Sequence, residues 1–127
     1  MGDEIMDCIF CKISKGELDS YTIYEDEIVK AYLDIHPASN GHTLIIPKKH
    51  FKDLDDIDEK TITHIMMVAK KVKKILEEKL GCTGVTLVQN NGDLQEVKHF
   101  HLHLKPYYPK CGRKAKVENI YEKLKRD

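Results

Sequence analysis

Three histidines alternate with apolar residues near the C-terminal end of the chain, in the run His99-Phe100-His101-Leu102-His103-Leu104. Successive side chains of a β-strand point to opposite faces, so an extended run places the three imidazoles on one face and the apolar residues on the other. Equivalent side chains along a strand lie roughly 6.6–7 Å apart. At that spacing neighbouring rings do not hydrogen-bond directly, but all three can surround one small anionic group.

The regular alternation separates this run from ordinary histidines. His36 and His64 stand alone, and we expect them to be surface or core residues without a chemical role. A histidine-rich metal tract would be contiguous and polar throughout, whereas every intervening residue here is apolar. The pattern therefore favours a binding or catalytic site built on one face of a strand.

Residues 95–103, with the sequence QEVKHFHLH, resemble the signature of the histidine triad superfamily of nucleotide hydrolases and transferases. Residues 34–37 and 41–50 resemble a second block of its Hint-type nucleoside phosphoramidase branch, and residues 8–13 resemble the opening of that branch. The resemblance covers residues 7–108 and leaves residues 109–127 as a C-terminal tail. It implies one domain over residues 1–127 with an α+β fold: an antiparallel sheet of about five strands, one long helix and a short C-terminal helix.

The residue pattern independently predicts these elements. Residues 22–25 and 28–33 read as a β-hairpin, followed by strands over residues 43–47 and 85–89. Asp56 and Glu59 resemble a capping box at the start of a long helix, and Gly81 is placed to end it. The apolar stripe of that helix has spacings of three and four: Ile62, Ile65, Met66, Ala69, Val72, Leu76 and Leu80.

The tail changes character after Pro106. Residues 110–116 are basic and are predicted to be irregular, and a short amphipathic helix follows with Val117, Ile120, Tyr121 and Leu124 on its apolar face. In Hint-like proteins this segment lies near the active site of a dimer. Covering an exposed edge of the sheet is the alternative role for the helix.

Charge and hydropathy exclude several classes of protein. The chain has 21 basic and 21 acidic residues, so no net field recruits nucleic acid or an anionic membrane. The N-terminus lacks the basic and apolar segments of a signal peptide, and no run is long enough to span a bilayer. We therefore predict a cytoplasmic protein without nucleic-acid or membrane partners.

The pair Cys8-x-x-Cys11 has several readings. Two disulfides suit a secreted chain, whereas in a reducing cytosol a redox couple or a metal site is expected. A redox couple belongs at a strand-to-helix junction of an alternating β/α pattern, which this sequence lacks. His50 and His99 are candidate partners for a tetrahedral zinc site, and zinc-containing members of the resembled family use these four positions. We predict structural zinc, with Cys82 and Cys111 as free thiols.

The resemblance assigns catalytic roles to the triad. The middle histidine of the family is the nucleophile, which implies that His101 forms a nucleotidyl-histidine intermediate that water then hydrolyses. Imidazole is partly neutral at pH 7 and can attack phosphorus. His103 would contact phosphate oxygens, His42 would orient the nucleophile, and His99 would join the metal site to the catalytic strand. Gln95 corresponds to the family's glutamine at the scissile or leaving-group oxygen.

Further positions correspond to nucleotide-binding residues of the family. Asp34 would accept hydrogen bonds from both ribose hydroxyls, a geometry that its two carboxylate oxygens allow. Asn90 would lie near the phosphate, and the backbone N–H groups of Glu96 and Val97 would help to bind it. Candidate purine-pocket residues are Ile9, Phe10, Ile35 and Leu44.

One segment departs from the family pattern. Between the Asn-x-Gly motif at residues 90–92 and Gln95 the chain is about two residues shorter than is usual in the family. Leu94 also stands where the family often has glycine, which lets backbone approach phosphate closely. The departure bears on the placement of Gln95 and on the leaving-group pocket. It does not affect the triad.

The function implied is cleavage of purine nucleoside phosphoramidates or related nucleotidyl bonds by a zinc-stabilised homodimer. Three alternatives remain: a dinucleoside polyphosphate hydrolase, a nucleotide-binding regulatory module with little turnover, and a purely structural zinc protein. The last leaves His42, His101 and His103 without a role.

Overall fold

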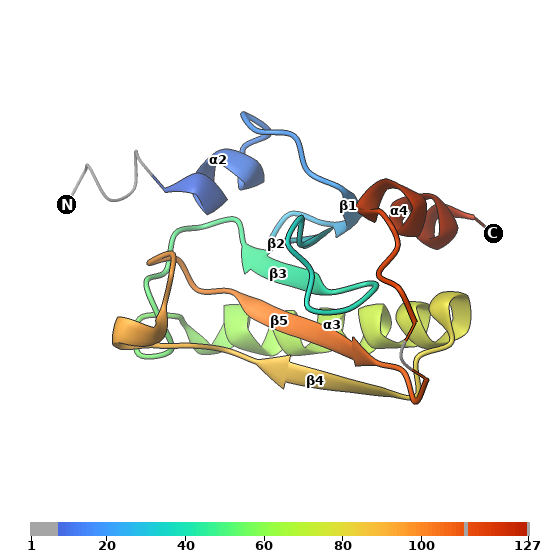
Figure 1. The fold of residues 1–127 in the computed structure, drawn as a ribbon. Coiled ribbons are helices and arrows are strands. Elements are labelled where there is room, and N and C mark those ends of the chain that lie inside the picture. Colours follow the sequence, from blue (N-terminus) through green and yellow to red (C-terminus); the bar gives the residue numbers. More distant parts are fainter. Residues whose placement is uncertain (1–7, 111, 127) are drawn as a thin grey trace.

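The structure, a computed structural model, describes residues 8–110 and 112–126. In chain order its elements are α2 (Ile9–Ser14), β1 (Thr22–Glu25), β2 (Val29–Leu33), β3 (Thr43–Pro47), α3 (Glu59–Leu80), β4 (Gly84–Val88), the 3-10 turn η1 (Gly92–Leu94), β5 (Leu102–Tyr107) and α4 (Val117–Lys125) (Figure 1). None of the helices in these residues is long and apolar enough to cross a membrane.

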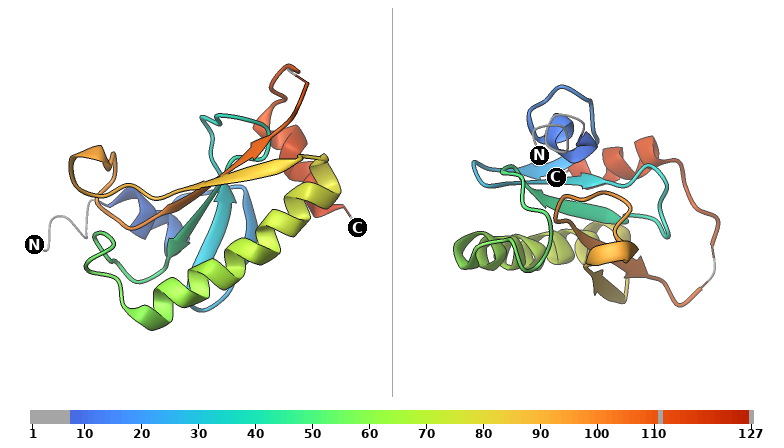
Figure 2. Two further views of the ribbon diagram at one scale, coloured as in Figure 1. Left: turned by 90° about the horizontal axis from the view of Figure 1, so that it is seen from below. Right: turned by 90° about the vertical axis from the view of Figure 1, so that its left-hand side faces the viewer.

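The five strands form one antiparallel sheet in the order β1-β2-β3-β5-β4. Helix α3 runs across one face of the sheet, and the short α2 lies on the opposite side (Figure 2). The predicted α+β fold, with a five-stranded antiparallel sheet and one long helix, is confirmed. The two faces of the sheet differ, because the long helix α3 covers only one of them (Figure 2).

The main hydrophobic core lies between the sheet and α3. It contains Phe100, Leu102 and Leu104, the three apolar residues of the alternating run, together with the α3 residues Ile65, Val68, Ala69, Val72 and Leu76. Met66 was predicted in the stripe, but it is 46% exposed and Val68 takes the inward place. A helix turns 100° per residue, so Met66 points away from the side that Ile65 and Ala69 bury.

The N-cap of the long helix lies two residues after the predicted one. Asp58 is the N-cap, and its carboxylate accepts the backbone N–H of Thr61 at 2.7 Å. The prediction of a capping box with Asp56 is wrong, because the Asp56 carboxylate accepts the backbone N–H of Lys52 in the preceding turn. Gly81 ends the helix as predicted, with a φ of 74° that favours glycine.

The histidine run is extended for only part of its length. β5 begins at Leu102, so His103 is the one triad member inside a strand. The backbone N–H of Phe100 bonds to the carbonyl of Phe51 at 2.6 Å and not to a neighbouring strand. The alternation of faces nevertheless persists, since His99 and His101 lie on the opposite side from Phe100 and Leu102.

The C-terminal segment follows its prediction over the residues described. No regular element occurs among residues 112–116, and α4 inserts Ile120 and Leu124 into the main core. The rings of Tyr21 and Tyr121 meet edge to face at 5.3 Å between centroids. Helix α4 therefore covers the β1 side of the sheet in this chain.

Candidate active site and metal cluster

The histidine face of the sheet is assembled by strand register. Tyr32 of β2 pairs with Leu44 of β3, and Leu44 pairs with His103 of β5, so these three side chains share one face. The backbone N–H of Asp34 bonds to the carbonyl of His42 at 2.9 Å, so the pairing of the two chain segments continues one residue beyond the ends of β2 and β3. Two groups of titratable side chains lie on this face.

His101 is oriented by the backbone. Its Nδ1 lies 2.7 Å from the carbonyl oxygen of His99, which can only accept, so Nδ1 carries the proton and Nε2 keeps its lone pair. The ring of Phe10 packs against it edge to face at 4.9 Å. Burial lowers the pKa of His101, while the bond to His99 and the carboxylate of Glu96 partly oppose that shift. The result is a neutral imidazole with an available nitrogen.

His42 and His103 form a hydrogen-bonded pair beside it. The backbone N–H of Ala38 donates to His42 Nδ1 at 2.9 Å, so the proton of a neutral His42 resides on Nε2. Nε2 lies 2.9 Å from His103 Nδ1 and 3.7 Å from an oxygen of Asp34. His103 therefore accepts at Nδ1 and carries its own proton on Nε2.

This pairing differs from the sequence prediction that His42 orients His101. The ring of His42 contacts His103, and the His99 carbonyl performs the orienting task at His101. The physical reason is register: β3 lies directly beside β5, where His103 resides, whereas His101 precedes that strand. Burial lowers the pKa of both members, that of His103 to about 4.

Cys8, Cys11, His50 and His99 form the second group, with all four ligand atoms within 4.8 Å of one another. His99 Nδ1 is 3.3 Å from Cys8 Sγ, 3.4 Å from Cys11 Sγ and 3.1 Å from His50 Nδ1. His99 Nε2 donates to the carbonyl of Pro47 at 2.9 Å, which leaves the Nδ1 lone pair directed at the thiols.

These four donors fit a zinc ion. Bond lengths of about 2.3 Å to sulfur and 2.1 Å to nitrogen place tetrahedral ligand atoms roughly 3.5 Å apart, close to the separations observed. Burial raises the pKa of Cys11 to about 12, with the neighbouring Cys8 adding to the shift, so Cys11 would need a bound cation to become a thiolate at neutral pH. Because four protein donors complete the set, such a site would be closed and structural.

A family model for the HIT domain matches residues 15–110. The chain belongs to the HIT domain family. The resemblance in residues 7–108 is thereby confirmed at the level of the family. HIT stands for histidine triad, and the triad of this HIT chain is His99, His101 and His103.

Several proteins are similar to this HIT chain. An uncharacterised HIT-like protein of Methanocaldococcus jannaschii is 43% identical over 115 residues, which cover 89% of this chain and 88% of that protein. The adenosine 5'-monophosphoramidase HNT1 of Saccharomyces cerevisiae is 46% identical over 101 residues, covering 78% of this chain and 61% of that protein. A solved Zn-bound histidine triad family protein from Mycobacterium smegmatis matches with a TM-score of 0.86 at 34% identity, over 94% of this chain and 91% of that one.

The segment before the triad folds inward despite its shortened sequence. Residues 92–94 form the turn η1, in which Gly92 has a φ of 66° and Leu94 is 75% exposed. Gln95 is only 5% exposed, and its side-chain amide donates to the carbonyl of Lys52 at 2.8 Å. Its Oε1 is buried without a hydrogen-bond partner in the described residues. The turn therefore delivers Gln95 to the interior next to the triad segment.

The other predicted nucleotide-binding residues divide into two environments. Phe10 and Leu44 are buried together in the cluster under α2, which Val97 borders. Ile9 and Ile35 are 46% and 64% exposed. Glu96 is exposed, and Asn90 is half-buried. The structure thus brings Phe10 and Leu44 to the histidine face, whereas Ile35 faces an open groove of about 550 Å³ beside the tail.

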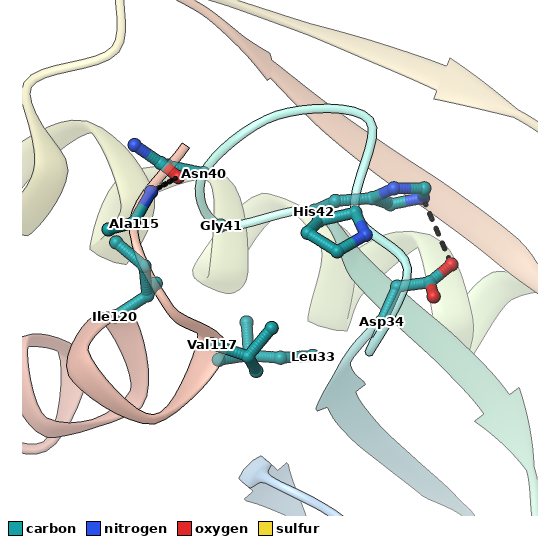
Figure 3. A pocket seen from close by; sticks show the side chains of 9 residues that line it. Leu33, Asp34, Asn40, Gly41, His42, Ala115, Val117 and Ile120 are labelled. Atoms are coloured by element: carbon teal, nitrogen blue, oxygen red, sulfur yellow. Dashed lines mark hydrogen bonds and ion pairs between the residues drawn. The ribbon is translucent and has the colours of Figure 1, made fainter. Parts of the chain in front are cut away.

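A small cavity separates the Asp34–His42 segment from the tail. It has a volume of about 10 Å³, and its lining includes Leu33, Gly41 and Ile120 (Figure 3). Such a volume holds no more than one water molecule, so it is not a substrate pocket. The tail is tied to the loop there, because the backbone N–H of Ala115 bonds to Asn40 Oδ1 at 2.8 Å.

Sequence reasoning missed three backbone groups of the site and one side chain on its face. The backbone groups are the Ala38 N–H and the carbonyls of Pro47 and His99, and no residue type signals them. The side chain is that of Tyr32 on β2, two positions before Asp34. Strand parity alone places Tyr32 on the face of Asp34, so this residue was open to prediction.

Proposed function

We propose that this HIT protein is a nucleotide hydrolase that cleaves purine nucleoside phosphoramidates, with His101 as the nucleophile. The observation that carries the proposal is the bond from His101 Nδ1 to the His99 carbonyl at 2.7 Å, because it leaves a lone pair on Nε2. The 46% identity to the adenosine 5'-monophosphoramidase HNT1 supports the choice of substrate class.

The reaction proceeds in two displacements. His101 Nε2 attacks the phosphorus, the phosphorus–nitrogen bond of the substrate breaks, and the departing nitrogen takes one proton from solvent to leave as the amine. Water then attacks the nucleotidyl-histidine and the bond from phosphorus to Nε2 breaks. The hydroxyl of the water stays on phosphorus in the released nucleoside monophosphate, its other proton returns to solvent, and His101 is again neutral. The neutral ring suits the first step, since a protonated imidazole has no lone pair with which to attack.

His103 and Asp34 hold the substrate in this scheme. Because His103 accepts from His42 at Nδ1, its Nε2–H is left to donate to a phosphate oxygen, where charge develops in the transition state. Asp34 Oδ1 already accepts the backbone N–H of His36 at 2.8 Å, which fixes the carboxylate for the ribose hydroxyls. Gln95, Asn90 and the backbone of residues 96 and 97 complete the proposed phosphate and leaving-group contacts. Ile9, Phe10, Ile35 and Leu44 remain the proposed purine-pocket residues.

Zinc is proposed at Cys8, Cys11, His50 and His99. Four nitrogen and sulfur donors leave no open coordination position, so the ion would stabilise the fold and take no part in the displacements. The Zn-bound relative from Mycobacterium smegmatis supports this assignment. A homodimer and a cytoplasmic location stay predictions from the sequence.

The decisive experiment replaces the nucleophile. His101→Asn retains an amide that can donate to the His99 carbonyl but lacks Nε2, and we expect turnover of adenosine 5'-phosphoramidate to fall on the order of 10⁴-fold or more. His36→Asn, at an exposed histidine, is the matched control and should retain wild-type kcat. Rapid quenching of wild type should trap one nucleotidyl group per active site by mass spectrometry. Turnover that survives His101→Asn, or wild type that binds nucleotide without hydrolysis, would refute the proposal.

A further inference from the structure

Tyr32 lies on the histidine face and has no role in the chemistry described so far. It stands on β2 in the row Tyr32–Leu44–His103 and two residues before Asp34. Its ring packs edge to face on Phe10 at 6.3 Å between centroids, within the cluster that contains Leu44. Tyr32 is therefore part of the floor on which a nucleoside held by Asp34 would rest.

The Tyr32 hydroxyl is buried and unpaired. The residue is 5% exposed, and its oxygen has no hydrogen-bond partner in residues 8–110 and 112–126. Three other tyrosine hydroxyls have partners: that of Tyr21 donates to Glu118, that of Tyr24 to Asp26 and that of Tyr108 to the Asn40 carbonyl. A buried polar group without a partner costs stability, and phenylalanine would fill the same space without that cost.

The Tyr32 hydroxyl keeps its proton at neutral pH and can donate a hydrogen bond. Burial raises the pKa of Tyr32, and the neighbouring charges of Asp34 and then Cys8 raise it further. A phenol is protonated at neutral pH in any case. Tyr32 lies on β2 and Asp34 directly follows that strand, two residues later. The repeat of an extended chain places the two attachment points roughly 6.6–7 Å apart on one face, which is comparable to the distance between the hydroxyl edge of a ribose and its base.

We infer that Tyr32 determines base recognition, its hydroxyl donating a hydrogen bond to a ring nitrogen of the bound purine. This inference rests on the proposed function, since it takes Asp34 as the ribose contact. On this inference the base would pack against Leu44, and a neighbouring side chain would move aside to expose the buried Tyr32 oxygen to it. The Tyr32 hydroxyl would then be the polar group that fixes the orientation of a base on the apolar surface of Phe10 and Leu44.

Tyr32→Phe tests the assignment, with Tyr21→Phe as the matched control at a surface hydroxyl. Both variants and wild type are assayed with adenosine 5'-phosphoramidate and with its 1-deaza, 3-deaza, 7-deaza and 2'-deoxy analogues. A contact to the base is present in ground state and transition state alike, so Tyr32→Phe should raise KM about three- to tenfold with kcat unchanged. With wild type, one deaza analogue should show the same three- to tenfold rise in KM relative to adenosine 5'-phosphoramidate. With Tyr32→Phe, that analogue and adenosine 5'-phosphoramidate should have equal KM values. Tyr21→Phe should match wild type throughout.

Several results would overturn the inference. Equal losses of Tyr32→Phe on every analogue would show no contact to a ring nitrogen, and coupling to the 2'-deoxy analogue alone would place the hydroxyl at the ribose. A loss in kcat, or a fall in Tm of several degrees without ligand, would show a structural partner. Wild type that turns over adenosine 5'-phosphoramidate while Tyr32→Phe behaves identically refutes this inference alone, whereas inactive wild type refutes the proposed function with it.

Discussion

Two histidine clusters lie on one face of the sheet, and they differ in which ring nitrogen is hydrogen-bonded to the backbone. In the cluster of Cys8, Cys11, His50 and His99, the Pro47 carbonyl accepts a hydrogen bond from His99 Nε2–H, so the Nδ1 lone pair of His99 points into the cluster. In the cluster of Asp34, His42 and His103, the Ala38 N–H donates a hydrogen bond to His42 Nδ1, so the Nε2–H of His42 points into the cluster.

That difference separates the proposed zinc site from the hydrogen-bonded pair of His42 and His103, which we call the relay. The donor atoms of Asp34, His42 and His103 also lie within 4.8 Å of one another, and by residue type they resemble a two-histidine, one-carboxylate metal site. A metal needs an unprotonated nitrogen, which a neutral His42 does not present there. A single backbone group beside each ring therefore decides what the cluster does, and residue identity alone does not.

The largest expected effect that tests this comparison is loss of zinc. Cys11→Ser should abolish zinc binding. Free zinc at about a thousand times its Kd stabilises the folded chain by roughly 4 kcal/mol, so the loss of binding should lower Tm by roughly 15 °C. Activity should fall too, since the carbonyl of His99 holds His101. Elemental analysis and thermal unfolding measure the two outcomes. Cys82→Ser, at a buried thiol outside the cluster, is the control. One zinc per chain retained in Cys11→Ser would place the metal elsewhere.

A smaller effect is expected from the relay. His42→Ala removes the donor to His103 Nδ1, so His103 is free to change tautomer and its Nε2–H is no longer held for phosphate. We expect kcat to fall about 10²-fold, a size typical of a group that acts on a proton in the transition state. His50→Ala supplies the contrast: it should lose zinc, whereas His42→Ala should keep one zinc per chain. Zinc loss in His42→Ala would contradict the division between the clusters.

Local patterns predicted much of the architecture and some of the site. The strand over residues 22–25 follows from the hairpin pattern, the strand over residues 43–47 from a continuous apolar run, and the helix end at Gly81 from glycine's tolerance of positive φ. The start of β5 at Leu102 did not, because the N–H of Phe100 is taken by Phe51, far away in sequence. The His42 partner likewise depends on which strand lies beside β3. Asp56 and Asp58 are the same residue type, so only the tertiary turn decides which one caps α3.

The smallest effect is a shift with pH in the relay. Burial, followed by the charges of His101 and His42, lowers the pKa of His103 to about 4, and burial lowers that of His42. Between the unfolded pKa near 6.5 and the folded value near 4 the unfolded chain binds more protons, so stability from these rings is complete above pH 6.5 and is lost as the pH falls toward 4. We expect kcat to stay flat from pH 8 to about 5 and to decline as the pH approaches 4. His42→Ala leaves a cavity that admits water, and it removes a ring whose charge would repel that of a protonated His103. Both changes should raise the pKa of His103, so the acid limb of the residual activity should move toward pH 6.5. A limb that stays in place would mean that His42 does not set the protonation of His103.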